Sequence, residues 1–366
     1  MAKAVAMARR GLGATYPNPC VGAVVVRRGA VVGSARSRPT GGAHAEVAAL
    51  ARAGASARGA TLYVTLEPCR HHGRTPPCTS AILAAGVSRV VVGVIDEASH
   101  VAGKGVAALR RAGVSVAVGV GGPACAALHE HYLHHVRTGL PFVTLKAAST
   151  LDGRIAAAGG DSRWITGESA RRHVHRQRAL HHAIAVGAAT VLADNPRLNV
   201  RWGRRSTTAG RSTLDPTPVV FDPSLRLGRP GVAALHLLDA PTLVVHTRRA
   251  SAAARRRLRA RGLELLEVAE CPGGGVAIDA ALRALGERSI RSLLVEGGGR
   301  LLGAFVSAAA WQRWLLYQAP KILGEGIPVV GGVAWDTVGA SPAVEVESRR
   351  MLGVDQLLVL RPTPSE

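Results

Sequence analysis

Apolar and polar residues alternate along the chain in blocks that predict short strands interleaved with helices. Five apolar segments in the N-terminal part have the length and β-branched content of strands: residues 21–27, 30–35, 61–66, 90–95 and 114–118. The segments around them predict helices, most of which end at a glycine: residues 1–11, 44–53, 78–85 and 106–112. Strands that alternate with short helices are typical of a layered α/β domain.

A second α/β pattern follows a predicted connecting helix at residues 124–136, which Thr138-Gly139-Leu140-Pro141 ends. Strands are predicted at residues 142–147, 183–186, 219–221, 242–246, 293–295, 313–319 and 356–360. Helices are predicted at residues 170–179, 252–261, 277–285 and 301–307, and a surface loop at residues 204–218. Because 366 residues exceed one typical core, we expect two domains, residues 1–140 and 141–366.

The composition favours a cytoplasmic protein that does not enter a membrane. No apolar stretch approaches the roughly 20 residues of a membrane span, and the N-terminus lacks the apolar core of a signal peptide. Hydrophobic residues make up 47% of the chain but aromatic residues only 3%, so Ala, Val and Leu must build most of the interior. The five cysteines are sparse and odd in number, which favours metal or catalytic roles over disulfides.

The net charge of +22 raises the question of a nucleic-acid partner. Only four lysines occur, at positions 3, 104, 146 and 321, and the arginines are scattered with short runs such as Arg255-Arg256-Arg257. Basic residues alone give only non-specific affinity for nucleic acids. We therefore expect small phosphorylated molecules, and not nucleic acid, to be the partners of these arginines.

Three short motifs predict a catalytic zinc site. His44-Ala45-Glu46 is followed by Glu67-Pro68-Cys69 and then by Pro77-Cys78, each placed between a predicted strand and a predicted helix. His44, Cys69 and Cys78 would hold one Zn²⁺ and leave its fourth position to a water, as in catalytic zinc sites. Glu46 is not a ligand and would relay the proton from the attacking water to a leaving amine. The residues therefore indicate hydrolytic deamination of a base.

The spacing of the cysteines departs from the usual deaminase signature P-C-x-x-C. Eight residues, 70–77, separate Cys69 from Cys78, and they form a cationic, Gly-containing loop that could meet a substrate phosphate. Cys78 is predicted to open its helix, where unpaired amide groups and the helix dipole favour a thiolate.

These residues resemble a known family, the bifunctional deaminase–reductases of riboflavin biosynthesis. The deaminase half is matched by Pro17-Asn18-Pro19-Cys20-Val21-Gly22 and by the run from Thr65 through His71-His72-Gly73-Arg74 to Cys78. The resemblance implies a cytidine-deaminase-like three-layer domain. It also implies that Asn18 orients the pyrimidine, and that Arg74 and His71 address the ribose phosphate. Asp96-Glu97-Ala98-Ser99 replaces a D-P-N-P-like turn of the family.

The resemblance continues into the reductase half. The matching segments are residues 146–153, 162–167, 190–196, 295–299 and 319–324. The resemblance implies a dihydrofolate-reductase-like α/β fold that uses NADPH. The cofactor contacts that it implies are Ala148, Trp164, Thr190, Asp194 and the turn Gly298, Gly299, Arg300, Leu301, Leu302, Gly303 and Ala304. The substrate contacts that it implies are Ser162, Arg178, Leu198, Arg201 and Glu296.

The chemistry of the residues agrees with two of these assignments. Glu296-Gly297-Gly298-Gly299 lies between a predicted strand and a predicted helix, where backbone N–H groups can bind an anion such as a pyrophosphate. It is not the G-x-G-x-x-G fingerprint, so an ordinary Rossmann fold is not predicted. Arg178 and Arg201 suit a phosphate through charge-assisted, forked hydrogen bonds.

The sequence thus predicts a bifunctional riboflavin-pathway enzyme, forming a homo-oligomer (dimer or tetramer). The first domain would deaminate 2,5-diamino-6-(5-phosphoribosylamino)pyrimidin-4-one, and the second would reduce the ribosyl group to ribityl with NADPH. A rival hypothesis is a deaminase of a nucleic-acid or nucleotide base with an accessory domain, for which a short C-x-x-C and stacking aromatics would be expected. Two further hypotheses are a non-catalytic zinc scaffold, in which Glu46 would have no purpose, and a chain with only one active half.

Overall fold

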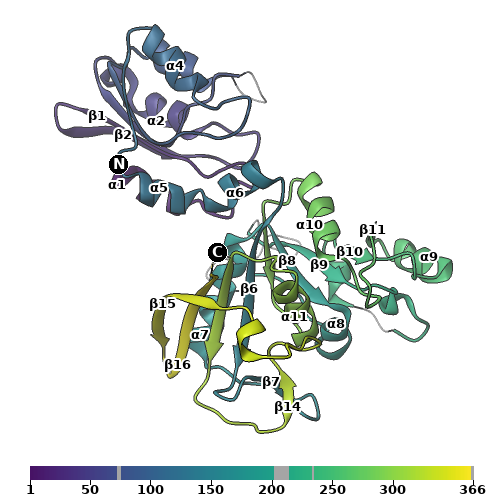
Figure 1. The fold of residues 1–366 in the computed structure, drawn as a ribbon. Coiled ribbons are helices and arrows are strands. Elements are labelled where there is room, and N and C mark those ends of the chain that lie inside the picture. Colours follow the sequence, from purple (N-terminus) through teal and green to yellow (C-terminus); the bar gives the residue numbers. More distant parts are fainter. Residues whose placement is uncertain (72–75, 202–213, 233–234, 364–366) are drawn as a thin grey trace. The chain divides into compact units, whose positions relative to one another are not determined.

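The computed structural model describes residues 1–71, 76–201, 214–232 and 235–363. The chain divides into two units, Met1–Gly139 and Leu140–Glu366, each with its own sheet and core (Figure 1). The predicted loop at residues 204–218 falls largely outside the described residues, and strand β9 begins within it at Thr217.

The first unit is built on a five-stranded sheet with the order β2-β1-β3-β4-β5. The strands are β1 Gly22–Arg27, β2 Ala30–Arg36, β3 Thr61–Leu66, β4 Arg89–Val94 and β5 Ser115–Val118. The β1–β2 hairpin and the β1–β3 pair are antiparallel, whereas β3, β4 and β5 are parallel. The carboxyl ends of β3 and β4 therefore meet at one edge of the sheet.

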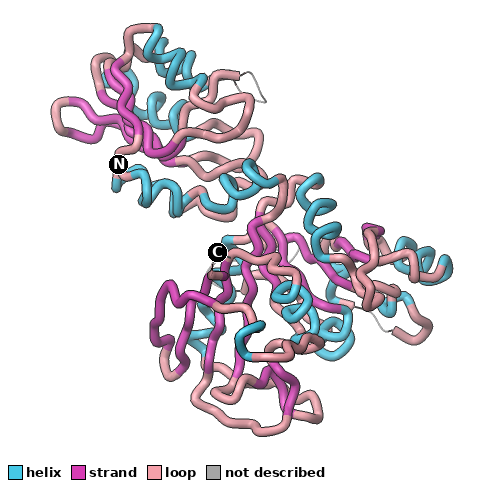
Figure 2. The backbone as a smooth tube through the Cα atoms, in the orientation of Figure 1, coloured by secondary structure: helices cyan, strands magenta, loops and turns pink. Residues whose placement is uncertain are grey.

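Helices cover both faces of this sheet (Figures 1 and 2). They are α1 Ala2–Arg9, α2 Ala45–Ala53, α3 Cys78–Ala84, α4 Lys104–Arg111, α5 Gly122–Leu128 and α6 Glu130–Thr138, with a 3₁₀ turn at Gly54–Ala57. Two glycines let helices approach the strands closely. A Cβ at Gly22 would lie 2.0 Å from the Ala4 carbonyl oxygen, and one at Gly33 would lie 2.3 Å from the Ala49 carbonyl oxygen. The core is made of Ala, Val, Leu and Ile, as the scarcity of aromatics predicts.

The predicted connecting helix at residues 124–136 is wrong in one respect, because two helices, α5 and α6, occupy this stretch. They meet at His129, whose backbone leaves the helical conformation (φ −103°, ψ 10°). The His129 ring is buried and its Nε2 lies 3.0 Å from Thr65 Oγ1. Burial lowers the pKa of His129 to about 4, so the ring stays neutral in this contact. A tertiary contact to β3 thus accompanies the break.

The second unit contains a nine-stranded sheet with the order β11-β10-β9-β8-β12-β6-β13-β16-β15. Its strands are β6 Phe142–Ser149, β8 Ala183–Gly187, β9 Thr217–Phe221, β10 Leu243–His246, β11 Glu264–Glu267, β12 Ser292–Val295, β13 Arg313–Gln318, β15 Val344–Leu352 and β16 Asp355–Pro362. Pairs from β11 to β13 are parallel, and β16 runs antiparallel to β13 and β15. A separate antiparallel pair joins β7 Arg154–Ala157 to β14 Gly326–Pro328.

Five α-helices occur among the described residues of this unit: α7 Glu168–Leu180, α8 Ala188–Asp194, α9 Ala252–Ala260, α10 Ile278–Glu287 and α11 Gly299–Ser307. Short 3₁₀ turns lie at Arg226–Gly228, His236–Asp239 and Val338–Ala340. The sequence did not predict β7, α8, β11, β14 or β15. β7, α8, β11 and β14 have seven residues or fewer, too few for a clear apolar period, and β15 begins with the alternation Val344-Glu345-Val346-Glu347 but is exposed along almost its whole length.

Within the described part of the chain, no helix combines the length and the apolar character that a membrane crossing requires.

Candidate functional sites

Three side chains that could hold a metal ion converge in the first unit. The ligand atoms of His44, Cys69 and Cys78 all lie within 4.8 Å of one another. His44 Nδ1 is 3.1 Å from Cys78 Sγ and 3.6 Å from Cys69 Sγ. His44 is the N-cap of α2, Cys69 follows β3, and Cys78 is the first residue of α3. Two helix starts and one strand end therefore bring these donors together, as the sequence predicts.

The helix start at Cys78, which we expected to favour a Cys78 thiolate, directs its first amide at the other sulfur. The first amide of α3, Cys78 N–H, donates to Cys69 Sγ (3.4 Å). Hydrogen bonds from Cys78 and His44 lower the pKa of Cys69, despite its partial burial. The pKa of Cys78 is raised by its hydrogen bond to Cys69 and by burial. The helix amide thus stabilises the neighbouring sulfur, because it points across the cluster.

Glu46 lies in the first turn of α2, two residues after His44, and its side chain is almost fully buried. Burial raises its pKa to about 7, and one of its oxygens, Oε2, has no hydrogen-bond partner within the described parts of the chain. A buried carboxylate oxygen without a partner is costly and calls for a ligand. The donor set also fits zinc, since one nitrogen and two sulfurs leave a fourth tetrahedral position for a water.

The other predicted deaminase residues lie nearer the surface. Asn18 is exposed in a turn in which its N–H donates to the Thr15 carbonyl (2.9 Å) and Thr15 Oγ1 donates back to the Asn18 carbonyl (3.0 Å). His71 is exposed and its ring meets the ring of His100 edge-on, with centroids 4.5 Å apart. Arg74 lies outside the described residues. Asn18 and His71 are therefore open to solvent, whereas the metal donors are partly or fully buried.

In the second unit a buried ion pair joins two of the predicted substrate residues. Arg178 of α7 donates from Nε and Nη2 to the two carboxylate oxygens of Glu296, which directly follows β12, both at 2.7 Å. Arg178 Nη1 also donates to the Asn199 carbonyl (3.0 Å). Lys146 Nζ of β6 lies 3.9 Å from Glu296 Oε2. Burial alone would raise the pKa of Glu296, but the positive charges of Arg178 and Lys146 outweigh it and lower the pKa to about 2.

Arg201 adds to the positive charge around this pair. Its backbone N–H donates to His175 Nδ1 (3.3 Å), and partial burial together with Arg178 and Arg197 lowers the pKa of its guanidinium. Cations that crowd one another in this way are ready to accept an anion. The other two predicted substrate residues carry no charge: Leu198 is buried with φ +49°, and Ser162 is half-buried.

Sequence reasoning missed Lys146 and His175, which belong to the same charged cluster. Lys146 had a visible signal, since it is the one charged residue within the strand Phe142–Ser149. Such a residue in a buried parallel strand must have a charged partner. His175 had no such signal, because several arginines and histidines share the α7 sequence.

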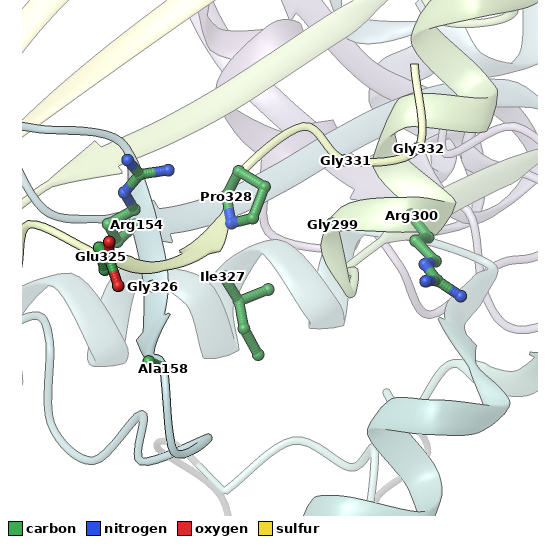
Figure 3. A pocket seen from close by; sticks show the side chains of 10 residues that line it. All are labelled: Arg154, Ala158, Gly299, Arg300, Glu325, Gly326, Ile327, Pro328, Gly331 and Gly332. Carbon is green, nitrogen blue, oxygen red and sulfur yellow. The ribbon is translucent and has the colours of Figure 1, made fainter. Parts of the chain in front are cut away.

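The glycine turn before α11, which contains several of the expected cofactor contacts, is closely surrounded by other segments. A Cβ at Gly298 would lie 3.4 Å from Thr190 Oγ1, so Gly298 and Thr190 are neighbours. A Cβ at Gly299 would lie 2.3 Å from the Pro328 carbonyl oxygen, which leaves room for glycine alone. Beside this turn is a cavity of about 700 Å³ with Arg154 and Glu325 at one end and Arg300 at the other (Figure 3).

The remaining predicted cofactor residues differ in exposure. Trp164 is 62% exposed, with the Arg171 guanidinium 4.5 Å from its ring centre. Asp194 is exposed at the end of α8, and Ala148 is half-buried in β6. The rest belong to α11: Leu302 and Gly303 are buried against the core and the 328–331 segment, and Leu301 and Ala304 are partly buried. The first two residues of α11, Gly299 and Arg300, border the cavity.

Two known protein families match the two parts of the chain. Residues 1–94 match the family model of the cytidine and deoxycytidylate deaminase zinc-binding region, and residues 141–357 match that of the RibD C-terminal domain. The chain therefore joins a zinc-dependent deaminase of the cytidine-deaminase type to a reductase.

Full-length relatives make this assignment specific. The riboflavin biosynthesis proteins RibD of Aquifex aeolicus and Escherichia coli are both 38% identical to this chain, with 99% and 98% of the chain and 97% and 98% of the relatives covered. The crystal structure of a diaminohydroxyphosphoribosylaminopyrimidine deaminase/5-amino-6-(5-phosphoribosylamino)uracil reductase from Thermotoga maritima aligns with a TM-score of 0.85, 35% identity and coverage of 99% of this chain and 97% of that one. RibD of Acinetobacter baumannii aligns with a TM-score of 0.87, 35% identity and coverage of 99% and 98%.

The chain belongs to the family of bifunctional riboflavin-biosynthesis deaminase–reductases. The predicted family, the predicted fold class of a cytidine-deaminase-like unit followed by a dihydrofolate-reductase-like unit, and the pairing of a hydrolytic with a reductive activity are thereby confirmed.

The ion pair of Glu296 makes the stability of the second unit depend on pH. A carboxyl group whose folded pKa is depressed contributes stability above its unfolded pKa and loses it as pH falls through the folded value. The second unit should therefore lose stability between about pH 4.5 and pH 2. Glu296→Gln should lower stability near neutral pH by about 3–5 kcal/mol, because it leaves Arg178 buried without its partner, and should flatten this acid dependence.

Thermal unfolding followed from pH 2 to pH 7 measures both effects. The matched control is Glu168→Gln, since Glu168 is an exposed residue of the same unit that pairs with Arg172. Equal acid dependence in wild type and Glu296→Gln would show that the depressed pKa of Glu296 does not contribute to folding.

Proposed function

We propose that deamination takes place at His44, Cys69, Cys78 and Glu46. The observation that carries this proposal is the buried, unpartnered Oε2 of Glu46 beside a one-nitrogen, two-sulfur donor set. A zinc ion held by the three ligands would supply an activated water for attack on the amine-bearing carbon of a pyrimidine ring. In this proposal His44, Cys69 and Cys78 hold the metal and leave one position open.

In the same proposal Glu46 moves the proton. Its carboxylate takes a proton from the attacking water and delivers it to the departing amine, so that ammonia leaves as a neutral molecule. Burial favours this role, since bulk water cannot compete for the proton at Oε2. Because Oε2 accepts no hydrogen bond from any described residue, it can take up the proton without losing a partner.

The proposed substrate is 2,5-diamino-6-(5-phosphoribosylamino)pyrimidin-4-one. Asn18 would donate and accept hydrogen bonds on the pyrimidine edge, and His71 and Arg74 would bind the ribose phosphate. The exposure of Asn18 and His71 supports these roles, because both side chains are open to a ligand.

We also propose that the second unit reduces the ribosyl group of the deaminated product to a ribityl chain. Arg178, Arg201 and Glu296 would bind and orient the phosphorylated sugar, with Ser162 and Leu198 completing the site. The crowding of Arg178, Arg197 and Arg201 supports an anionic ligand at this place. NADPH would supply the hydride.

The proposed NADPH site is the glycine turn and the neighbouring cavity. Gly298, Gly299 and Arg300 present a helix start to an anion such as the pyrophosphate, and Thr190 is adjacent. The cavity volume of about 700 Å³ is within the range of cofactor pockets. Ala148, Trp164, Asp194 and residues 301–304 complete the proposed set.

We also propose the partners, the cellular location and the oligomeric state of the enzyme. The partners would be small phosphorylated pyrimidines, the enzyme would work in the cytoplasm, and it would assemble as a dimer or tetramer.

The role of Glu46 predicts a selective loss of one activity. Glu46→Gln removes the proton-accepting oxygen but keeps the size of the side chain, so deamination should fall about 10²–10⁴-fold while zinc content is unchanged. The same preparation should be assayed for ammonia release, zinc content and NADPH oxidation. The rate of NADPH oxidation should not change. The control is Glu97→Gln, which alters an exposed carboxylate paired with Arg137. Comparable ammonia release by Glu46→Gln would contradict its role.

The role of Arg201 predicts weaker substrate binding in the reductase. Arg201→Ala removes a cation from the proposed phosphate site, so KM for the phosphorylated intermediate should rise about 10–100-fold, as expected for a lost charge-assisted hydrogen bond. NADPH oxidation measured against intermediate concentration reports this change, and Arg172→Ala, which alters an exposed arginine of α7, is the control. An unchanged KM would mean that the phosphate binds elsewhere.

A further inference from the structure

Glu67 belongs to the Glu67-Pro68-Cys69 motif, yet its side chain contacts the start of a helix. It directly follows β3 and is 4% exposed. Its Oε1 accepts a hydrogen bond from Val106 N–H (3.0 Å), and its Oε2 accepts from Gly103 N–H (2.9 Å) and Asp96 N–H (3.3 Å). Three backbone donors thus converge on one buried carboxylate.

Helix α4 needs this carboxylate at its start. The N-cap Gly103 is in the left-handed conformation (φ 81°) and supplies no side-chain cap. The first N–H groups of a helix have no partner within the helix, and a negative charge there is favourable. Glu67 accepts hydrogen bonds from two of these groups, Gly103 N–H and Val106 N–H, which lie 36 and 39 residues after it in the chain. It is therefore a cap that joins β3 to α4 across the fold.

The same helix start packs on the peptide that carries a metal-binding cysteine. A Cβ at Gly105 would lie 2.0 Å from the Pro68 carbonyl oxygen and 3.2 Å from Glu67 Oε1. Pro68 immediately precedes Cys69, and the Cys69 carbonyl accepts from Thr79 N–H of α3 (3.2 Å). The segment of Cys69 is therefore held by α4 on one side, through Glu67 and Gly105, and by α3 through Thr79.

A second anchor fixes the neighbouring turn. Asp96, whose N–H donates to Glu67, accepts from Ala98 N–H (2.9 Å) and from Tyr132 Oη (3.0 Å and 3.1 Å to its two oxygens). The turn at residues 96–99, in which this chain departs from the family pattern, is thereby connected to Glu67. The carboxylate of Glu67 thus joins the ends of β3 and β4 and the start of α4.

We propose that Glu67 is a positioning residue of the metal centre. By tying the end of β3 to the start of α4, it fixes the Pro68–Cys69 peptide and so the place of Cys69 Sγ relative to His44 and Cys78. This role rests on the proposed zinc site. Residues that orient metal ligands without touching the metal change metal affinity by about 10–100-fold when they are replaced.

The first variant is Glu67→Gln in the full chain. Glutamine keeps the size of the side chain. Its NH₂ group, however, faces a backbone N–H, and two donors cannot form a hydrogen bond with each other. Zinc affinity, measured by competition with a chromophoric chelator, should fall about 10–100-fold. After substitution with Co²⁺, the thiolate-to-cobalt absorption should shift, because the geometry of Cys69 has changed. NADPH-dependent reduction by the same chain should not change, which verifies that the second unit is intact.

The second variant, Gly105→Ala, keeps the carboxylate and forces the Pro68 carbonyl away from α4. Alanine favours helices over glycine, so a loss of zinc affinity in this variant would not come from a weaker helix. If Glu67→Gln does not fold, the zinc affinity of Gly105→Ala tests the positioning role instead. Glu97→Gln is the matched control, since Glu97 lies in the adjacent turn but is exposed and pairs with Arg137. It should bind zinc like the wild type.

The outcomes separate this role from a purely structural one. Folded Glu67→Gln and Gly105→Ala chains that are less stable, yet bind zinc with wild-type affinity and show the wild-type cobalt spectrum, would overturn the proposal. A wild-type chain that binds no zinc would overturn the metal site itself, and the positioning role with it.

Discussion

The deaminase unit depends on the meeting of three donor atoms that come from separate segments. His44, Cys69 and Cys78 each lie where a loop joins a helix start or a strand end. These places coincide because β2 and β3 are both antiparallel to β1, so they run in the same direction and end at the same edge of the sheet. Two adjacent sulfurs and a buried carboxylate without a full set of partners are unfavourable by themselves. Groups of this kind cluster at functional sites, which supports the proposed site of deamination.

The second unit follows the same architectural rule with different chemistry. Glu296 follows β12, Gly187 ends β8 and Lys146 lies in the second half of β6, and these three strands are parallel neighbours. Ligands of open α/β sheets bind outside the carboxyl ends of such strands. The glycine turn after Glu296 begins α11 at this edge. The end of β12 therefore carries both a predicted substrate residue, Glu296, and the predicted cofactor turn that follows it. The Arg178–Glu296 pair then fixes α7 against that edge by two charge-assisted hydrogen bonds.

Local signals explain what the sequence could predict. The three side chains of the candidate metal site were recognisable because each motif is short and its residue types are chemically specific. Glu67 was visible in the same motif, but its partners Gly103 and Val106 lie 36 and 39 residues away, and no local pattern reveals that contact. The break at His129 accompanies a contact to Thr65, 64 residues distant, and was missed for the same reason. Strands β7 and β14 contain four and three residues, too few for an alternation to be recognised.

The strongly positive charge of the chain is easier to understand from the contacts of its arginines. Arg154, Arg257 and Arg261 donate to the carbonyls of Gly324, Gly228 and Val232, which lie in loops and at the end of a 3₁₀ turn. In these places a guanidinium satisfies carbonyl groups that the loops leave without a backbone partner. Arg178 instead lies in the reductase cluster with Lys146. A long cationic side chain therefore has two uses in this protein, as a hydrogen-bond donor that fixes loops and as the partner of a buried carboxylate. Neither use requires a continuous basic surface, so the net charge by itself carries no information about nucleic-acid binding.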